Sequence, residues 1–260
     1  MKCKELIGKI EAVYPKTAAI QRDHVGLLCG RSEKEVGKVF IALDATEAII
    51  LKAIEVGADM LITHHPMFRS GIESITDLDY TGRRLLRLIQ HDISYYAIHT
   101  NYDVLALSDI VGTILGLQNQ VILWDTMEQD GNTLGIGRIG ELSNPCSIAV
   151  CCDLVKEKFG LEHVRVFGDL DKVVAKVAIS PGSGRSTIPY ALAKEVDLLI
   201  TGDIGHHDGL DAIDQGLAII DAGHYSTEYL FVKEMQSFLL AQDSTLEVMI
   251  EKRHHPFQTV

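Results

Sequence analysis

The fold is decided by KVFIALDATEAIILKAIEVGADMLIT, residues 38–63, and by its counterpart VAKVAISPGSGRSTIPYALAKEVDLLIT, residues 174–201. In each stretch two short apolar runs enclose a segment whose apolar residues recur with helical spacing. The closing runs, GADMLIT and EVDLLIT, are nearly superimposable. Such runs are typical of parallel strands that are buried on both faces of a sheet. Each half of the chain is therefore predicted to contain a strand, a helix and a second strand.

The similarity continues downstream, where HDISYYAIHTNYD (91–103) is matched by QGLAIIDAGHYSTE (215–228). Each segment is an apolar strand that ends in a histidine, with a carboxylate four residues further on. Although α/β proteins reuse such runs by chance, four matched elements in the same order favour an internal duplication. We therefore predict an α/β fold of two repeats, each a mixed, mostly parallel sheet flanked by helices.

The break between the repeats is expected near residues 118–145, where QDGN (129–132) and LSNP (142–145) are turn-forming. On this basis the first repeat spans 1–125 and the second spans 126–260. We expect the two repeats to pack together around one site.

The composition restricts the possible functions. The 260 residues include 24 Lys and Arg against 36 Asp and Glu, a net charge of −12, which disfavours binding to nucleic acid or to an anionic membrane. No apolar run approaches the roughly 18 residues needed to span a bilayer, and the N-terminal MKCKELIGKIEAVYPK resembles an amphipathic helix, not a signal peptide. Five cysteines without regular spacing predict neither a disulfide framework nor a thiolate zinc site. We expect a cytoplasmic protein. Eleven histidines against one tryptophan and seven phenylalanines are a first indication of metal or acid–base chemistry.

Thr63-His64-His65-Pro66 is the strongest chemical motif, because it follows directly after a predicted strand. Ligands of open α/β sheets collect at the carboxyl ends of the strands. Adjacent strand residues point to opposite faces, so both histidines face one site only if the chain turns there. Pro66 ends regular structure at this point. An isolated His-His pair is nevertheless more often incidental than a metal site.

A second motif follows the last predicted strand of each repeat. His224 and Glu228 have the i, i+4 spacing that places two side chains on the same face of a helix, and His99 and Asp103 repeat it in the first half. For either pair alone, helix capping at a strand end is the simpler explanation. Together with the His-His pair, they supply enough imidazole and carboxylate donors for two metal ions if one carboxylate bridges the ions.

Other polar motifs are weaker. GIGRIG (135–140) matches a dinucleotide-binding fingerprint, but ELSNP follows it instead of a helix, so we interpret it as a strand with turns. PGSGRS (181–186) lacks the spacing and the lysine of a phosphate loop, although it is suited to open a helix beside an anion. His207, His206 or Asp203 is a candidate general base or partner of a metal ligand, and exposed loop polarity explains these residues almost as well.

In this order, four segments resemble the NIF-three-like dinuclear metal-centre family, whose members are often named GTP cyclohydrolase I type 2 homologs. The segments are ITHHPMF (62–68), AIHTNYD (97–103), TGDIGHHDGLDA (201–212) and DAGHYSTE (221–228). Asp23-His24-Val25-Gly26-Leu27 also resembles the family's early D-N-x-G-L segment, with His in place of Asn. The resemblance covers nearly the whole chain, and it implies two intertwined α/β repeats without the inserted domain of longer members.

The resemblance also implies a ligand set and an assembly. Two divalent ions per chain (Zn, Mn, Fe, Ni or Co) would be held by the following residues: His64, His65, Asp103, His224 and Glu228. Glu228 is the expected bridging ligand, and His99 then faces the substrate or supports a ligand. Family members resemble toroidal homohexamers whose metal sites face the interior, so we expect the same assembly here.

Two functions remain open. The first is a metal-dependent hydrolase that acts on a nucleotide or another phosphorylated small molecule, with His99 or His207 moving the proton. The family name implies opening of the GTP ring, but no guanine pocket is identifiable in the sequence. The second is a non-catalytic metal-binding ring that serves as an interaction or metal-handling protein. Two divalent ions against two carboxylates would leave a cationic spot, which suits a small anionic substrate even in an acidic protein.

Overall fold

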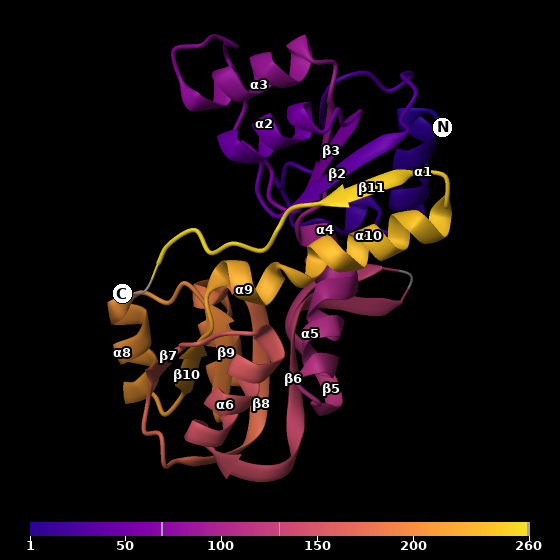
Figure 1. The fold of residues 1–260 in the computed structure, drawn as a ribbon. Coiled ribbons are helices and arrows are strands. Elements are labelled where there is room, and N and C mark those ends of the chain that lie inside the picture. Colours follow the sequence, from indigo (N-terminus) through magenta and orange to yellow (C-terminus); the bar gives the residue numbers. More distant parts are fainter. Residues whose placement is uncertain (69, 130, 259–260) are drawn as a thin grey trace. The chain divides into compact units, whose positions relative to one another are not determined.

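The computed structural model describes residues 1–68, 70–129 and 131–258. The chain divides into two units, which are coloured by sequence in Figure 1. The first unit is Met1–Tyr102 with Tyr229–His254, and the second is Asp103–Glu228 with His255–Val260.

The first unit is built on a five-stranded sheet with the order β1-β4-β3-β2-β11. Its elements are α1 (Cys3–Val13), η1 (Lys16–Ala18), β1 (Gly26–Cys29), β2 (Lys38–Ala42), α2 (Glu47–Glu55), β3 (Met60–Thr63), α3 (Tyr80–Gln90), β4 (Ser94–Ala97), α4 (Thr100–Tyr102), α10 (Leu230–Gln242) and β11 (Glu247–Ile250). All neighbouring strands are parallel except β1, which is antiparallel to β4. The carboxyl ends of four strands therefore meet at one edge of this sheet.

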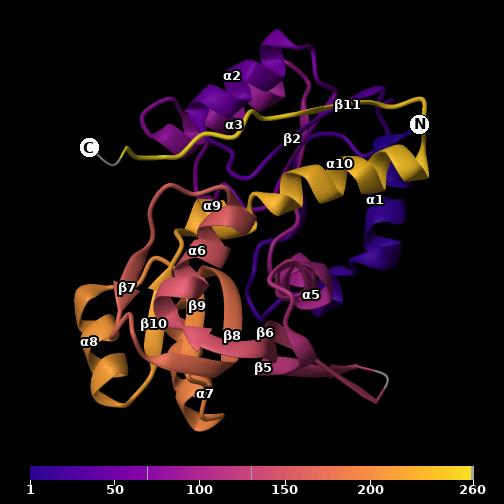
Figure 2. The same cartoon turned by 60° about the horizontal axis from the view of Figure 1, so that its bottom comes forward.

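Apolar residues cover both faces of this sheet. Phe40, Leu61 and Tyr95 form one buried cluster with residues of α2 and α3. Tyr96 points to the opposite face, where its hydroxyl donates to Glu11 of α1 at 3.2 Å. Figures 1 and 2 show α1 and α10 on that side of the sheet. The amphipathic N-terminal helix expected from the sequence is confirmed as α1, which buries the side chain of Leu6.

The second unit is built on a six-stranded sheet with the order β5-β6-β8-β9-β10-β7. Its elements are η2 (Asp103–Leu107), α5 (Ser108–Ile114), β5 (Gln118–Gln129), β6 (Asn132–Ser147), α6 (Ile148–Phe159), β7 (Arg165–Phe167), β8 (Val173–Ser183), η3 (Gly184–Thr187), α7 (Ile188–Ala193), β9 (Leu198–Gly202), α8 (His206–Asp214), β10 (Ala218–Asp221) and α9 (His224–Glu228). Strands β8, β9 and β10 are parallel, whereas β5, β6 and β7 are antiparallel to their neighbours. Helices α7 and α8 bury apolar side chains against one face of this sheet.

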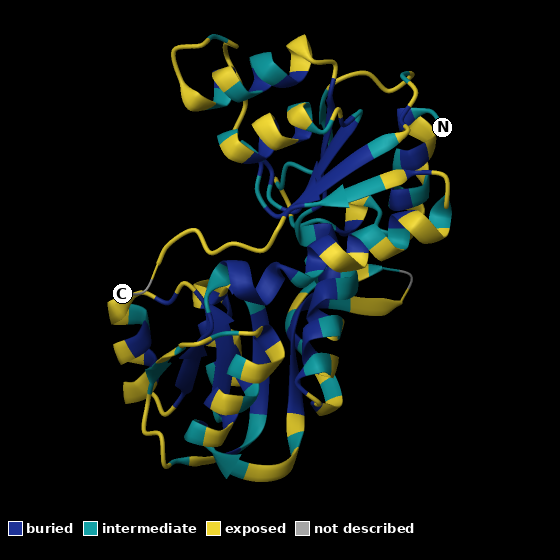
Figure 3. Cartoon of the chain, in the orientation of Figure 1, coloured by how far each residue is buried: buried dark blue, intermediate teal, exposed yellow. Residues whose placement is uncertain are grey.

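The predicted duplication is confirmed by the strand order. Strands β2-β3-β4 in the first sheet correspond to β8-β9-β10 in the second, and each set ends on an antiparallel edge strand, β1 or β7. Figure 3 shows that the central strands of both sheets are buried. The second sheet contains more antiparallel pairing than the sequence pattern predicts, because the region expected to break the repeats forms the long β5–β6 hairpin. GIGRIG lies within β6, as interpreted from the sequence.

The first and second units of the structure divide the chain at other residues than the expected ranges 1–125 and 126–260. The last strand, β11, pairs in parallel with β2, so residues 229–254 return to the first unit. The second unit begins at Asp103, and its helix α5 packs against its strand β6. The repeats are thus intertwined, with the end of the chain completing the first sheet. No helix in the described ranges combines the length and apolar character needed to cross a membrane.

Candidate metal centre

The two histidines of the THHP motif are held by a turn at the end of β3. The His65 N–H donates to the carbonyl of Leu43 at 2.9 Å, which continues the pairing between β2 and β3 for two residues beyond β3. The Thr63 hydroxyl donates to the His65 carbonyl at 2.7 Å, and the Tyr95 hydroxyl donates to the same oxygen at 3.1 Å. Tyr95 also accepts from the Met67 N–H at 2.8 Å. Burial raises the pKa of Tyr95 to about 12, so its hydroxyl stays a neutral donor.

Three imidazoles gather at this edge of the first sheet. The ring centroids of His64 and His65 lie 5.0 Å apart, and His99, which follows β4, lies 5.2 Å from His64 and 5.5 Å from His65. One ring nitrogen from each of the three lies within 4.8 Å of the others, which is close enough for one metal ion. His64 also packs against Phe231 of α10, with 5.0 Å between ring centroids.

Each of these histidines is oriented through its Nδ1 atom. Nδ1 of His64 lies 2.9 Å from the carbonyl of Ile98, and Nδ1 of His65 lies 2.8 Å from a carboxylate oxygen of Asp44. A carbonyl or carboxylate can only accept, so Nδ1 carries the proton in both rings and Nε2 keeps the lone pair. A histidine that binds a metal usually donates its other ring N–H to a carbonyl or carboxylate in this way, which fixes its tautomer and the orientation of its ring.

His99 has the same support from Asp23. Its Nδ1 lies 2.9 Å from both carboxylate oxygens of Asp23, which also accepts from the Thr100 N–H at 3.1 Å and from the Thr100 hydroxyl. Burial alone would raise the pKa of Asp23, but the hydrogen bonds and charge of His99 and the hydrogen bonds of Thr100 bring it well below its usual range. Asp23 is therefore ionised and fixes the orientation of the His99 ring.

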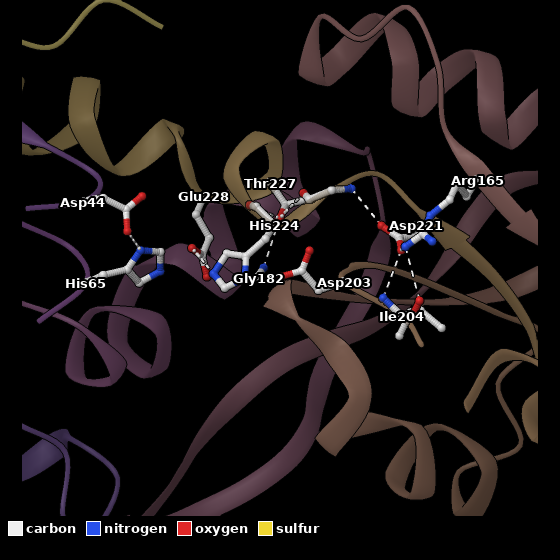
Figure 4. Close-up of polar contacts among 11 residues, drawn as sticks. Asp44, His65, Arg165, Gly182, Asp203, Ile204, Asp221, His224, Thr227 and Glu228 are labelled. Atoms are coloured by element: carbon white, nitrogen blue, oxygen red, sulfur yellow. Dashed lines mark hydrogen bonds and ion pairs between the residues drawn. The ribbon is translucent and has the colours of Figure 1, made fainter. Parts of the chain in front are cut away.

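In the second unit, His224 and Glu228 form the pair expected from their spacing. They begin and end α9, and Nε2 of His224 lies 2.9 Å from a carboxylate oxygen of Glu228 (Figure 4). Nδ1 of His224 lies 2.9 Å from Asp203, which follows β9 and has a left-handed backbone with φ of 56°. The second unit thus offers an imidazole and a carboxylate, and the imidazole is again supported by an aspartate.

A buried carboxylate fixes the turn that carries Asp203. Asp221, at the end of β10, is 4% exposed and accepts from the Ile204 N–H at 2.9 Å and from the Gly223 N–H at 3.0 Å. Arg165 of β7 pairs with the same carboxylate (Figure 4). Asp221 therefore positions both Asp203 and the start of α9.

The PGSGRS segment lies against the His224–Glu228 pair. Gly182 has φ of 72°, and a Cβ at this position would lie 2.0 Å from a carboxylate oxygen of Glu228. Its N–H donates to the Thr227 hydroxyl at 3.0 Å (Figure 4). Pro181, Gly182 and Ser183 end β8, and the segment continues as the η3 turn that leads into the short α7. Only a glycine allows the chain to pass this close to Glu228.

Asp103 and His207 complete the candidate residues. Asp103 begins η2, a π-helical stretch, and its carbonyl accepts from the Ser108 hydroxyl at 2.8 Å. π-helical turns are rare and often occur at functional sites. His207 is exposed in the first turn of α8, where its ring lies 5.2 Å from that of His206. Asp203, one of the weaker candidates, supports His224 directly.

Sequence reasoning missed Asp44 and Asp221 as site residues. Both lie at the end of a parallel strand, β2 or β10, which is the signal that identified the histidines. Asp44 is the only charged residue of the otherwise apolar stretch FIALDA. A carboxylate at the end of such a run is the sequence signal that could have identified it as a site residue.

An α/β duplication with anchored histidines and carboxylates at its strand ends defines a class of candidate metal proteins. The chain belongs to the Duf34/NIF3 (NGG1p interacting factor 3) family, whose profile matches residues 1–256. It is 35% identical over 264 residues to a GTP cyclohydrolase 1 type 2 homolog of Clostridium perfringens, with all of both chains covered. A homolog of the same name from Methanocaldococcus jannaschii is 34% identical over 244 residues, which cover 92% of this chain and 95% of the relative.

Solved structures agree with this assignment. A Bacillus cereus protein related to NIF3 superposes with a TM-score of 0.92 at 26% identity, covering 100% of this chain and 99% of the other. Reduced HcgD from Methanocaldococcus jannaschii superposes with a TM-score of 0.84 at 33% identity, covering 96% of this chain and 97% of the other. The family resemblance and the fold predicted from the sequence are therefore confirmed.

Proposed function

We propose that this chain binds two divalent metal ions and uses them to hydrolyse a nucleotide or another phosphorylated small molecule. One observation carries the proposal: His64, His65 and His224 each have Nδ1 on an oxygen acceptor. Imidazole nitrogens with carboxylate oxygens are a donor set that suits Zn, Mn, Fe, Ni or Co. The anchored rings therefore fit a first-row metal ion.

The proposed ligands come from both units: His64 and His65 from the first, and Asp103, His224 and Glu228 from the second. Asp103 directly follows Tyr102, the last residue of the first unit before the chain leaves it. Glu228 directly precedes Tyr229, where the chain returns. Both carboxylates are thus covalently joined to the ends of the first unit. The proposed bridging ligand is Glu228, as the family resemblance implies.

Two bound ions would supply Lewis acidity and water activated near neutral pH. His99 is the proposed proton carrier, because Asp23 holds Nδ1 and leaves Nε2 as the basic nitrogen. Asp23 also stabilises the imidazolium that forms when His99 accepts a proton. His207 is the second candidate for this transfer.

The proposed substrate is a small anion. Two divalent ions against the carboxylates of Asp103 and Glu228 leave a local positive charge, which favours a phosphate group. The relatives named GTP cyclohydrolase 1 type 2 homolog make GTP the first nucleotide to test. The net charge of −12 argues against nucleic acid as the substrate.

We also propose that the chain assembles as a toroidal homohexamer in the cytoplasm, as the family resemblance implies. Light scattering coupled to size-exclusion chromatography tests the assembly, since the chain mass is 28.6 kDa. A monomeric species at all concentrations would contradict it.

The test of function starts from metal loading. The purified protein is loaded separately with Mn, Zn, Fe, Ni or Co, its bound metal is measured, and hydrolysis of GTP, other nucleotides and generic phosphodiesters is screened. His64→Ala and Glu228→Ala are expected to lose metal and activity together. His163→Ala, which removes an exposed histidine of the second unit, is the matched control and should retain both.

Three outcomes separate the alternatives. Activity that survives in the His64→Ala/Glu228→Ala protein would contradict the dinuclear hydrolase. Full metal binding without turnover of any substrate would favour the non-catalytic metal-binding ring. Less than one ion per chain with every metal would contradict both. Among active preparations, His99→Ala and His207→Ala identify the residue that moves the proton, because only the correct one lowers kcat without releasing metal.

A further inference from the structure

Two cysteines meet at the beginning of α6. The Sγ atoms of Cys146 and Cys151 lie 3.6 Å apart. Ser147 is the N-cap of this helix, and its side chain accepts from the Val150 N–H. Cys146 therefore occupies the position before the cap and Cys151 the fourth helical position, which are the two positions that contact each other in a hydrophobic staple. The spacing C-S-I-A-V-C is thus sufficient to bring the two thiols together.

This pair lies outside the proposed metal site. Neither cysteine is among the proposed ligands, and both belong to the second unit. Cys146 is half-buried at the end of β6, where it pairs with Val174 of β8, whereas Cys151 is buried. All five cysteines of the chain are free thiols. An oxidant therefore reaches Cys146 more easily than Cys151.

We propose that Cys146 and Cys151 are a modification site, a thiol pair that forms a reversible disulfide with a low-molecular-weight disulfide as oxidant. The Cys146 thiolate attacks one sulfur of the oxidant, forming a mixed disulfide and releasing one thiolate. Cys151 then loses its proton and attacks the Cys146 sulfur, which forms the protein disulfide and releases the second thiolate. The protein loses two protons and two electrons, and the oxidant is reduced to two thiols.

The geometry supports this order of events. A disulfide needs the two sulfurs about 2.05 Å apart, so the 3.6 Å between them must shorten by about 1.5 Å when the bond forms. Burial, reinforced by the hydrogen bond and the charge of Cys146, raises the pKa of Cys151 above its usual range. Cys151 is therefore a thiol at neutral pH and a poor first nucleophile, which leaves the first step to Cys146. In a reducing compartment such a bond is transient and reports the redox state.

Cys152 provides an internal control. It follows Cys151 in the same helix, where successive side chains point about 100° apart, so only one of the two faces Cys146. Burial raises the pKa of Cys152 as well. A reaction governed by burial or by sequence proximity alone would not distinguish Cys151 from Cys152, whereas the staple contact does.

The experiment uses the full chain with glutathione disulfide as the probe. After oxidation, free thiols are blocked with N-ethylmaleimide and the protein is digested with trypsin. Cleavage after Arg138 and Lys156 releases residues 139–156, which contain Cys146, Cys151 and Cys152. We expect this peptide to carry a single label, on Cys152, and to regain all three labels when dithiothreitol precedes blocking. Cys152→Ser should form the same bond, and Cys151→Ser should retain glutathione on Cys146.

Several results would overturn the proposal. A label on Cys151, a bond between Cys151 and Cys152, or three labels after oxidation would each contradict it. Circular dichroism before and after oxidation confirms that each variant is folded. The reaction is expected to be the same in His64→Ala, so failure of the proposed metal function leaves this test unaffected.

Discussion

The ends of β3 and β9 occupy the same place in the two repeats, but they carry different chemistry. Thr63 pairs with Ala97 in the first sheet, and Thr201 pairs with Asp221 in the second. His64 and His65 follow Thr63, whereas a glycine and an aspartate follow Thr201. The first repeat therefore provides two imidazoles at this point, and the second provides a carboxylate that orients the imidazole of His224 at the start of α9.

The difference has a steric cause. A Cβ on Gly202 would lie 2.4 Å from the backbone nitrogen of His224 and 2.8 Å from the carbonyl oxygen of Gly182. The backbone at the start of α9 thus occupies the space that a side chain at this position would need. The second repeat cannot hold a histidine where the first has His64, and its imidazole comes from α9 instead. The duplicated scaffold has kept its strands while its strand ends have specialised.

Gly202→Ala tests this steric cause and should have the largest effect. The added methyl group meets backbone atoms that cannot move without shifting α9, so we expect the free energy of unfolding to fall by about 3 kcal/mol. Urea denaturation followed by circular dichroism measures the change. We also expect weaker metal binding, because His224 and Glu228 are displaced together.

Gly8→Ala is the matched control for this substitution. Gly8 lies within α1, and an added Cβ has no atom within 4 Å. The change should be neutral or stabilising by up to about 1 kcal/mol, since alanine is the better helix former. Equal stability of the Gly202→Ala protein and the wild type would show that α9 adapts freely, and the steric explanation would then fail.

The supporting aspartates of the two repeats can be compared directly by metal binding. Asp44→Asn in the first and Asp203→Asn in the second each replace the carboxylate that accepts from a histidine Nδ1. If both histidines are ligands, each change should weaken metal affinity about 10–100-fold, as measured by competition with a chelator. Asp211→Asn, on the exposed side of α8, should leave the affinity unchanged. An effect in only one repeat would assign the metal to that repeat alone.

The histidines at the strand ends were predictable from the sequence, but the carboxylates that accept hydrogen bonds from their Nδ1 atoms were not. Apolar runs identify strands and therefore locate His64 and His65, which directly follow β3, and His224, which lies three residues beyond the end of β10. The acceptors come from other strands and loops: Asp44 is 21 residues from His65, and Asp23 is 76 residues from His99. No local periodicity encodes such pairs.

The same limit applied to the fold. Repetition in the sequence predicted β2-β3-β4 and β8-β9-β10, whose members are neighbours along the chain. It could not predict that β11, a four-residue strand, returns to pair with β2. Nor did it predict the β5–β6 hairpin, because LSNP is turn-forming in isolation but lies within β6, where the register with β8 shifts.

Asp23→Asn separates the role of His99 from that of the other histidines. Because Asp23 has a folded-state pKa below its unfolded value of about 3.9, its ionised form stabilises the protein above about pH 4, and this contribution is lost as the pH falls further. We expect the free energy of unfolding of the variant to be about 2 kcal/mol lower than that of the wild type at pH 6. This difference in stability should become smaller below pH 4. Urea denaturation of both proteins between pH 3 and pH 6 measures the difference. Metal affinity should change less than twofold if His99 is not a ligand.

Tyr95→Phe should have the smallest effect, and it tests how the turn after β3 is held. Its hydroxyl bonds Met67 and His65 in the first repeat, whereas the carboxylate of Asp221 holds the corresponding turn in the second. Loss of the hydroxyl should cost about 1 kcal/mol, because the Thr63 hydroxyl still donates to the His65 carbonyl. Tyr96→Phe, which loses a hydrogen bond to Glu11 instead, should lower the free energy of unfolding by a similar amount in urea denaturation.

Only the Tyr95 variant should also weaken metal binding, since the Tyr96 hydroxyl faces α1 and plays no part in orienting the histidines. Equal metal affinity in both variants would mean that Thr63 alone fixes the turn.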